Sequence, residues 1–314
     1  MGHMPVRVEA FDGPFGFSSR WRLYFRERFP LPLQAPVIAV FSSAVFVYAS
    51  AIRSRSGRPS LTAVAAAFVV VLLVFLQLRI LDEFKDYEQD TRFRPYRPVP
   101  RGIVTLRELG WLGVVAAFAQ VAASALVGPR ALVALTVVWV YAGLMAAEFF
   151  IPAWLKAHPL SYMASHMVVV PLIVAYVATC AGAKTPTVPL MWLAGMSYLS
   201  FCVFEIGRKI RAPADEQEGV DTYSALWGRR SAVIAWLLAM AGAGAFAVLA
   251  ARRVGTWPVA AGLAAAVITV AAAVGTRFLA DPRPKRGQWF FAMSGVWLVV
   301  MYLALGVGAW MSLP

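Results

Sequence analysis

The sequence predicts an all-α integral membrane protein in which nine transmembrane helices form one bundle. Of the 314 residues, 60% are hydrophobic and 14% are charged, whereas soluble domains carry roughly a quarter charged residues. Nine mostly apolar stretches approach the length of about 20 residues that a helix needs to cross a membrane. These stretches do not alternate apolar with polar residues, so we expect helices, which satisfy their own backbone groups in lipid.

In chain order, the expected spans are Ala35–Ile52, Leu61–Ile80, Leu109–Val127, Ala131–Ile151, Ser165–Ala183, Val188–Glu205, Ser231–Ala251, Pro258–Thr276 and Trp289–Trp310. The connections are too short for a separate soluble domain, so we expect a single domain over residues 1–314. We interpret residues 1–4 ("MGHM") as a remnant of cloning. Residues 5–34 form an N-terminal segment in which "SSRWRLYFRERFP" is either an interfacial helix or an ordered tail.

The distribution of positive charge predicts the orientation of the bundle. The net charge is +13; 21 of the 29 Lys and Arg residues lie in the N-terminal segment and in the loops after even-numbered spans, and 7 lie after odd-numbered spans. The positive-inside rule therefore places the N-terminus in the cytoplasm and the C-terminus outside. We expect a bacterial or archaeal cell membrane, contact with anionic lipid rather than nucleic acid, and no obligate protein partner.

Two segments on the predicted cytoplasmic side are rich in carboxylates. The first, "LDEFKDYEQD" (81–90), follows the second span, and a continued helix would place Asp82, Asp86 and Asp90 along one face. Like charges at this spacing destabilise a helix unless a cation compensates them. The second segment follows the sixth span and contains Glu205, Asp215, Glu216, Glu218 and Asp221 among several basic residues.

Such a pair of segments suits Mg²⁺, which binds one or two carboxylates and leaves other positions to water and phosphate. Several Mg²⁺ ions between the segments would bridge to a diphosphate. Basic side chains nearby would hold the remaining phosphate oxygens: Arg92, Arg94, Arg97, Arg101, Lys156, Arg208 and Lys209. A diphosphate bound at the mouth of an apolar bundle implies an amphiphilic substrate such as a prenyl diphosphate. The simpler alternative is that both segments are solvated loops.

The first segment resembles the first aspartate-rich motif of the UbiA superfamily of intramembrane prenyltransferases. That motif reads Asn-Asp-x-x-Asp-x-x-x-Asp, followed by Arg-Pro and a glycine shortly before Ser or Thr. Asp86 and Asp90 match, whereas Asp82 replaces the Asn and Glu83 replaces the first Asp. The continuation matches at Arg97-Pro98, Gly102 and Thr105. Nine spans with the N-terminus inside also resemble the architecture of this superfamily.

The second motif of the superfamily, Asp-x-x-x-Asp-x-x-x-Gly-x-x-Thr, is matched only in its later part. Asp215, Gly219 and Thr222 fit it, but Arg211 stands at the first Asp, for which Glu205, Glu216 or Glu218 would have to substitute. A Lys-Arg pair after the fourth span is represented by Lys156 alone, with Ala157 at the Arg position. These departures leave the metal count on the second side open.

The resemblance implies a UbiA-type bundle around a central cavity with cytoplasmic cap loops, and a Mg²⁺-dependent transfer of a prenyl group to a small or lipophilic acceptor. The expected metal ligands are Asp82, Glu83, Asp86, Asp90, Asp215 and Glu218, and turnover is expected to depend on Asp86, Asp90, Asp215 and Glu205. The expected diphosphate-binding residues are Arg92, Arg97, Lys156, Arg208 and Lys209. The expected acceptor or cavity residues are Glu148, His158 and His166.

Two alternatives stay open. Part of the superfamily cyclises the prenyl cation without an acceptor, so a terpene cyclase that releases diphosphate is the second hypothesis. A transporter is the third, but transporters place charge near the bilayer midplane, whereas the spans here are nearly free of charge in their centres. Under either enzyme hypothesis, alanine at Asp86 or Asp90 is expected to abolish turnover without unfolding the protein.

Overall fold

The computed structural model describes residues 16–53 and 60–313, and residues 1–4 of the predicted cloning remnant lie outside this part. All regular elements within it are helices. In chain order they are α1 (Phe17–Arg28), α2 (Leu31–Arg53), α3 (Leu61–Lys85), α4 (Tyr87–Phe93), α5 (Leu106–Val127), α6 (Pro129–Ala146), η1 (Glu148–Phe150), α7 (Pro152–Ala157), α8 (Pro159–Met167), α9 (Val169–Cys180), α10 (Val188–Arg208), η2 (Pro213–Asp215), α11 (Tyr223–Leu226), α12 (Arg229–Val254), α13 (Trp257–Ala280) and α14 (Gln288–Met311).

Nine segments of the described chain are long and apolar enough to cross a membrane, which confirms the predicted fold class. They are α2, α3, α5, α6, the pair α8–α9, α10, α12, α13 and α14. The bounds differ most around the fourth and fifth spans. The fourth was predicted to reach Ile151 but ends at Ala146, and the fifth begins at Pro159 rather than Ser165.

The early end of α6 has a local cause. Glu148, Phe149 and Phe150 adopt positive φ angles of 46°, 51° and 62°, which residues with a side chain rarely adopt. A short 3₁₀ turn therefore replaces the last helical turn, and Pro152 then begins α7. The chain is bent back across the end of the bundle instead of continuing along α6.

The spanning helices pack side by side, and α2 and α10 lie in the middle of the arrangement. Helix α2 packs against α3, α9 and α14, and α10 packs against α9, α12 and α14. A cluster of aromatic rings joins α2, α3, α10 and α14: the Phe41 ring centroid lies 5.0 Å from that of Tyr302, and Phe75 stacks on Phe201 at 5.7 Å. These rings lie in the interior of the bundle, where the resemblance implies a cavity, and a small hollow lies beside Phe41, Phe201 and Tyr302.

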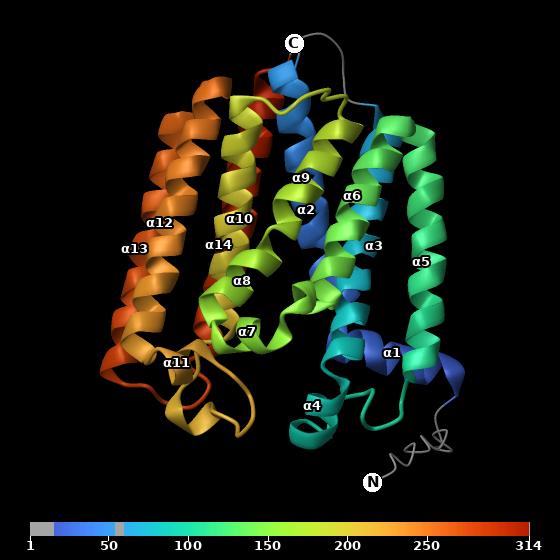
Figure 1. Cartoon of the computed structure of the whole chain (residues 1–314). Helices are drawn as coiled ribbons and strands as arrows, with labels where there is room; N and C mark the ends of the chain where they lie inside the picture. The colour runs from blue at the N-terminus through green and yellow to red at the C-terminus, as the bar shows by residue number, and fades with distance from the viewer. Residues whose placement is uncertain (1–15, 54–59, 314) are drawn as a thin grey trace.

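The short elements gather at one end of the bundle. Figure 1 shows α1, α4, α7 and α11 at this end and the C-terminus at the opposite end. The predicted interfacial segment is helical as α1, which is attached to the start of α5 by an ion pair of 3.0 Å between Arg20 and Glu108. Glu108 also completes a capping box with Thr105, which fixes the start of α5. Both carboxylate-rich segments follow helices that end here.

Candidate active site

The first carboxylate-rich segment is an almost continuous helix. The structure ends α3 at Lys85 and begins α4 at Tyr87, but the backbone N–H of Asp86 donates to the carbonyl of Asp82 at 2.9 Å. The N–H of Asp90 likewise donates to the carbonyl of Asp86 at 2.8 Å. The helical hydrogen bonds therefore run through the break, and the three aspartates keep the four-residue spacing that the sequence predicts.

Asp86 is the carboxylate in this row without a partner. Among the described residues it forms no ion pair and no side-chain hydrogen bond, whereas Asp82 pairs with Arg79 at 3.6 Å and with Lys85 at 3.5 Å. Burial raises the pKa of the Asp86 carboxyl above its usual range, and the charges of Asp82 and Asp90 raise it further against the opposing effect of Lys85. A cation beside Asp86 would relieve this cost.

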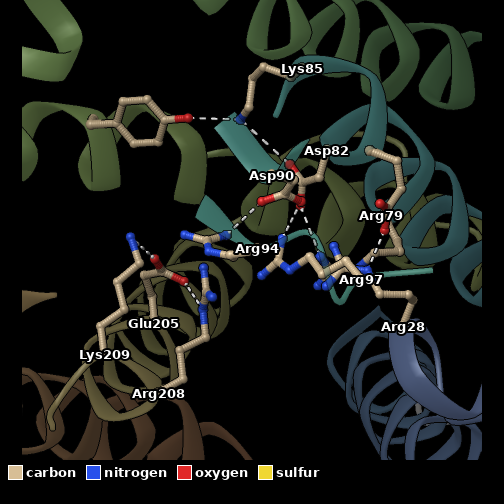
Figure 2. A network of polar contacts seen from close by, with 12 residues as sticks. Arg28, Arg79, Asp82, Lys85, Asp90, Arg94, Arg97, Glu205, Arg208 and Lys209 are labelled. Atoms are coloured by element: carbon tan, nitrogen blue, oxygen red, sulfur yellow. Dashed lines mark hydrogen bonds and ion pairs between the residues drawn. The ribbon is translucent and has the colours of Figure 1, made fainter. Parts of the chain in front are cut away.

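Asp90 is buried in an ion pair with two arginines, as Figure 2 shows. Its Oδ1 lies 3.0 Å from Nη1 of Arg94, and its Oδ2 lies 2.5 Å from Nη1 of Arg97. Burial, followed by the charge of Arg28, lowers the pKa of the Arg97 guanidinium. Removal of Asp90 would leave two poorly solvated cations unpaired, so the expectation that Asp90→Ala leaves folding intact needs correction.

Glu83 lies on a different side of α3 from this row. Its side chain is 1% exposed and accepts a hydrogen bond of 2.5 Å from Nε of Arg28 in α1. A second contact, between Arg101 and Glu27 at 3.6 Å, links α1 to the loop that follows α4. In this arrangement Glu83 anchors α1, although the sequence pattern assigns it to metal.

The second carboxylate-rich segment is largely satisfied by its own contacts. Glu205, near the end of α10, pairs with Arg208 at 2.5 Å and with Lys209 at 3.1 Å (Figure 2). Asp215 accepts a hydrogen bond of 2.7 Å from the backbone N–H of Lys285. Glu216 accepts hydrogen bonds from the hydroxyls of Thr222 and Ser224 at 2.6 and 2.8 Å. Glu218 is exposed.

The two segments meet. The side-chain amide of Gln89 in α4 donates to the carbonyl of Gly219 at 3.0 Å, and the hydroxyl of Tyr96 donates to Oε1 of Gln217 at 3.1 Å. Gly219 has a φ of 71°, and a side chain there would collide with the Phe93 ring. The close approach of the segments therefore requires glycine at this position.

The carboxylates themselves do not surround a single point. No three His, Cys, Asp or Glu side chains in residues 16–53 and 60–313 are grouped closely enough to hold a metal ion. The donor set still suits a hard divalent cation. Asp82 and Asp86 offer carboxylate oxygens, and Mg²⁺ commonly takes one or two carboxylates and fills its other positions with water and phosphate.

A second group of polar side chains lies on the other side of Lys85. Nζ of Lys85 donates to the Tyr162 hydroxyl at 2.8 Å, and the Tyr162 ring stacks on the His166 ring with centroids 4.0 Å apart. Nδ1 of His166 lies 2.8 Å from the carbonyl of Tyr162, and its buried Nε2 has no hydrogen-bond partner among the described residues. Tyr162 therefore lies between His166 and Lys85, the lysine that also contacts Asp82 of the aspartate row.

The remaining predicted residues lie nearer the surface, apart from Glu148. Glu148 is buried, and its carboxylate lies 3.8 Å from Nζ of Lys156, whose side chain is 69% exposed. His158 is exposed, stacks on Trp154 at 4.4 Å and contacts the Trp154 carbonyl through Nδ1 at 2.8 Å. Arg92 lies over the Phe93 ring at 5.0 Å. Of these residues, only Glu148 is shielded from solvent as a cavity residue would be.

Sequence reasoning missed two cations of this site. Lys85 and Arg28 each contact an acidic side chain of α3. The signal for Lys85 was available, since it stands three residues after Asp82 on a helix, where side chains meet. Arg28 precedes Glu83 by 55 residues, and a contact at that separation has no signal in a single sequence.

In the part of the chain that the structure describes, nine spanning segments with two carboxylate-rich segments at one end define an integral membrane protein with a polar site at the mouth of an apolar core. The chain belongs to the UbiA prenyltransferase family, whose model matches residues 43–305. This confirms the resemblance that the two motifs indicate.

Solved structures share the fold at low sequence identity. A UbiA homologue from Aeropyrum pernix K1 is 19% identical with a TM-score of 0.62, over 87% of this chain and 97% of that chain. A UbiA homologue from Archaeoglobus fulgidus, bound to GPP and Mg²⁺, is 12% identical with a TM-score of 0.54, over 88% and 98%. A digeranylgeranylglyceryl phosphate synthase is 16% identical with a TM-score of 0.56, over 92% and 98%. No curated protein sequence matches this chain.

Proposed function

We propose that this protein is a Mg²⁺-dependent intramembrane prenyltransferase that ionises a prenyl diphosphate at the end of α3 and transfers the prenyl group to a small or lipophilic acceptor. The observation that carries the proposal is Asp86, a half-buried carboxylate at the end of an apolar helix, which lies between two other carboxylates and forms no ion pair among the described residues. Family membership supports the transfer chemistry, and the Archaeoglobus homologue binds GPP and Mg²⁺.

In this proposal Asp82 and Asp86 hold the metal, and Asp90, Asp215 and Glu218 complete the site after rearrangement. When bound, Mg²⁺ neutralises the charge that develops on the leaving diphosphate. Cationic side chains near this site would also neutralise the charge on the leaving diphosphate. Arg94, Arg97, Arg208 and Lys209 already lie at the mouth of the bundle, each paired with a carboxylate.

The ion pairs couple the two ligands. Arg94 and Arg97 cannot bind a phosphate with their full charge while they are paired with Asp90. For the same reason, Asp90 cannot bind a metal ion with its full charge while it is paired with them. The proposal therefore predicts an exchange of partners: with both ligands bound, Asp90 would help to hold Mg²⁺, and Arg94 and Arg97 would hold phosphate oxygens. Because each step uncovers a charge that the other ligand neutralises, metal and diphosphate bind with positive cooperativity.

The acceptor is assigned to the side of Lys85 on which Tyr162 and His166 stack. Because Nδ1 of His166 donates to the Tyr162 carbonyl, Nε2 is left as a hydrogen-bond acceptor. In this position it orients an acceptor hydroxyl or removes the proton that the acceptor loses. Glu148, which is also buried, is the second candidate for that proton.

The decisive experiment separates transfer from cyclisation. The purified protein is incubated with geranyl, farnesyl or geranylgeranyl diphosphate and Mg²⁺, first without an acceptor and then with aromatic and glyceryl phosphate acceptors. Transfer predicts little consumption of the diphosphate until the right acceptor is added, and none with EDTA. Stoichiometric cyclic terpene in the acceptor-free reaction would overturn the transferase proposal in favour of a cyclase.

We also propose that this end of the bundle faces the cytoplasm and that the C-terminus lies outside. The excess of Lys and Arg in the N-terminal segment and the even-numbered loops supports this orientation. A reporter that is active only in the cytoplasm, fused to the C-terminus, should be silent. An active C-terminal fusion would reverse the assignment.

A further inference from the structure

A hollow lies at the end of the bundle opposite the candidate active site. It occupies about 300 Å³ between the ends of α2, α12 and α14, near the C-terminus in Figure 1. This volume is at the lower limit of pockets that bind small molecules. Its polar lining comes from Arg53 at the end of α2, Arg252 and Arg253 at the end of α12, and Ser312 after α14.

The positive charge of the arginines that line this hollow is not balanced by nearby carboxylates of the described residues. Within residues 16–53 and 60–313, no acidic residue lines the hollow, and none of its three arginines forms an ion pair with a carboxylate. At the opposite end of the bundle the arginines Arg94, Arg97 and Arg208 all pair with acidic side chains. Three like charges around one hollow repel one another unless an anion lies between them.

Helix dipoles explain only part of this arrangement. Arg53, Arg252 and Arg253 lie in the last turns of α2 and α12, where the partial negative charge of a helix end favours cations. That effect holds for any direction in which the side chain points away from the helix axis. It does not require arginines from two helices to line the same hollow.

The distribution of charge along the chain makes this cluster unusual. Only 7 of the 29 Lys and Arg residues lie in the loops of this end, and three of those seven line the hollow. The surroundings indicate a lipid as the source of the anion. Arg252 lies 6.0 Å from the ring centroid of Trp257, and Trp257 and Trp310 are exposed at the ends of spanning helices, where aromatic residues mark the headgroup level.

We propose that Arg53, Arg252 and Arg253 bind the phosphate of an anionic membrane lipid whose headgroup occupies this hollow. Ile52 and Val254 form the apolar part of the lining, against which the glycerol end of the lipid would pack. Basic pockets between transmembrane helices on the cytoplasmic or matrix side bind anionic headgroups, and we extend the same charge pairing to this end of the bundle. The proposal does not depend on the reaction at the other end of the bundle.

The test compares two variants that lose the same charge at this end. R252Q/R253Q removes two arginines of the hollow, and R130Q/K184Q removes two exposed cations that do not line it. Each full-length protein is purified in detergent with phosphatidylglycerol, or with phosphatidylcholine alone, and retained lipid is measured by native mass spectrometry. Thermal unfolding of the same samples checks that the variants are folded.

The proposal expects wild type and R130Q/K184Q to retain phosphatidylglycerol but not phosphatidylcholine, and R252Q/R253Q to lose roughly tenfold or more of that retention. If R252Q/R253Q does not fold, the single variant R53Q takes its place and should lose retention in the same sense. Equal retention by the hollow variants and the control would overturn the proposal. Displacement of the lipid by millimolar inorganic phosphate would also overturn it, by identifying a soluble anion as the ligand.

Discussion

The two carboxylate-rich segments have similar compositions and pair most of their buried carboxylates, but they differ at one residue, Asp86. In the second segment, Glu205, Asp215 and Glu216 each have a cation or hydrogen-bond donor from the protein itself. In the first, Asp86 has none among the described residues, and its pKa is raised by burial and by its neighbours. The first segment therefore needs something from outside the protein, whereas the second is stable as it stands. The difference predicts that metal binding begins at the first segment.

The largest effect is expected at Asp86. Asp86→Asn keeps the shape of the side chain but removes the charge, so turnover should fall by about 10²–10³-fold because a charge-stabilising group is lost. Folding should not suffer, since the ionised carboxylate is costly in the absence of metal. Initial rates with saturating prenyl diphosphate and Mg²⁺ measure the loss. Wild-type activity in this variant would remove Asp86 from the site.

The same residue predicts a pH dependence without any turnover. Because the folded state raises the pKa of Asp86, it binds more protons than the unfolded state between the ordinary and the raised value. Stability in EDTA should therefore fall as the pH rises from the ordinary carboxyl range, about 4, through the raised value. Thermal unfolding at several pH values measures this effect. Asp86→Asn should flatten it, and Mg²⁺ should oppose it in wild type but not in the variant.

Asp90 should differ from Asp86 by affecting stability. Asp90→Ala leaves Arg94 and Arg97 without their carboxylate, and loss of one partner in a buried ion pair costs about 3–5 kcal/mol. A lowered unfolding temperature for Asp90→Ala beside an unchanged one for Asp86→Asn would confirm the distinction. The matched double variant Asp90→Ala with Arg97→Ala should recover part of the loss.

Arg97 alone should act mainly on the donor. Arg97→Ala removes a hydrogen bond to a charged phosphate, so the KM for the prenyl diphosphate should rise about tenfold while kcat changes less. Steady-state kinetics at fixed Mg²⁺ distinguish the two constants. Arg107→Ala is the control, since Arg107 is exposed in the first turn of α5 and lies outside the Asp90 pair. An equal rise in KM for both variants would contradict the role of Arg97.

The smallest effects should lie in the second segment. Glu216→Gln disturbs the hydrogen bonds from Thr222 and Ser224, so the loop should exchange its amide hydrogens faster, with a cost of about 1 kcal/mol. Glu218→Gln changes an exposed side chain, and its effect on stability should stay within about 0.5 kcal/mol. Hydrogen exchange of residues 213–224 measures both. Activity is a separate measurement: if Glu218 completes the metal site as proposed, Glu218→Gln should lower turnover, and unchanged turnover would remove Glu218 from that site.

Much of the fold was predictable because the membrane imposes strict rules on it. The length and apolarity of each span follow from bilayer thickness, and the four-residue spacing of Asp82, Asp86 and Asp90 follows from helix geometry. The turn at Glu148–Phe150 was not predictable, because three positive φ angles without a glycine are imposed by tertiary packing. The partners of the carboxylates were not predictable either. Arg28 and Glu83 are far apart in sequence, and which cation neutralises which acid depends on the packing of α1 against α3.

The ion pair that attaches α1 to α3 makes the position of α1 sensitive to metal binding. Glu83 neutralises Arg28, and one carboxylate cannot fully serve both this guanidinium and a divalent ion. If the family pattern is right in giving Glu83 to metal, loading the site loosens the amino-terminal helix. A protease that cuts at the exposed Arg26 would then cleave faster in Mg²⁺ than in EDTA. Equal cleavage would mean that Glu83 stays paired with Arg28 when Mg²⁺ is present. In that case Glu83 holds α1 in place and does not bind the metal.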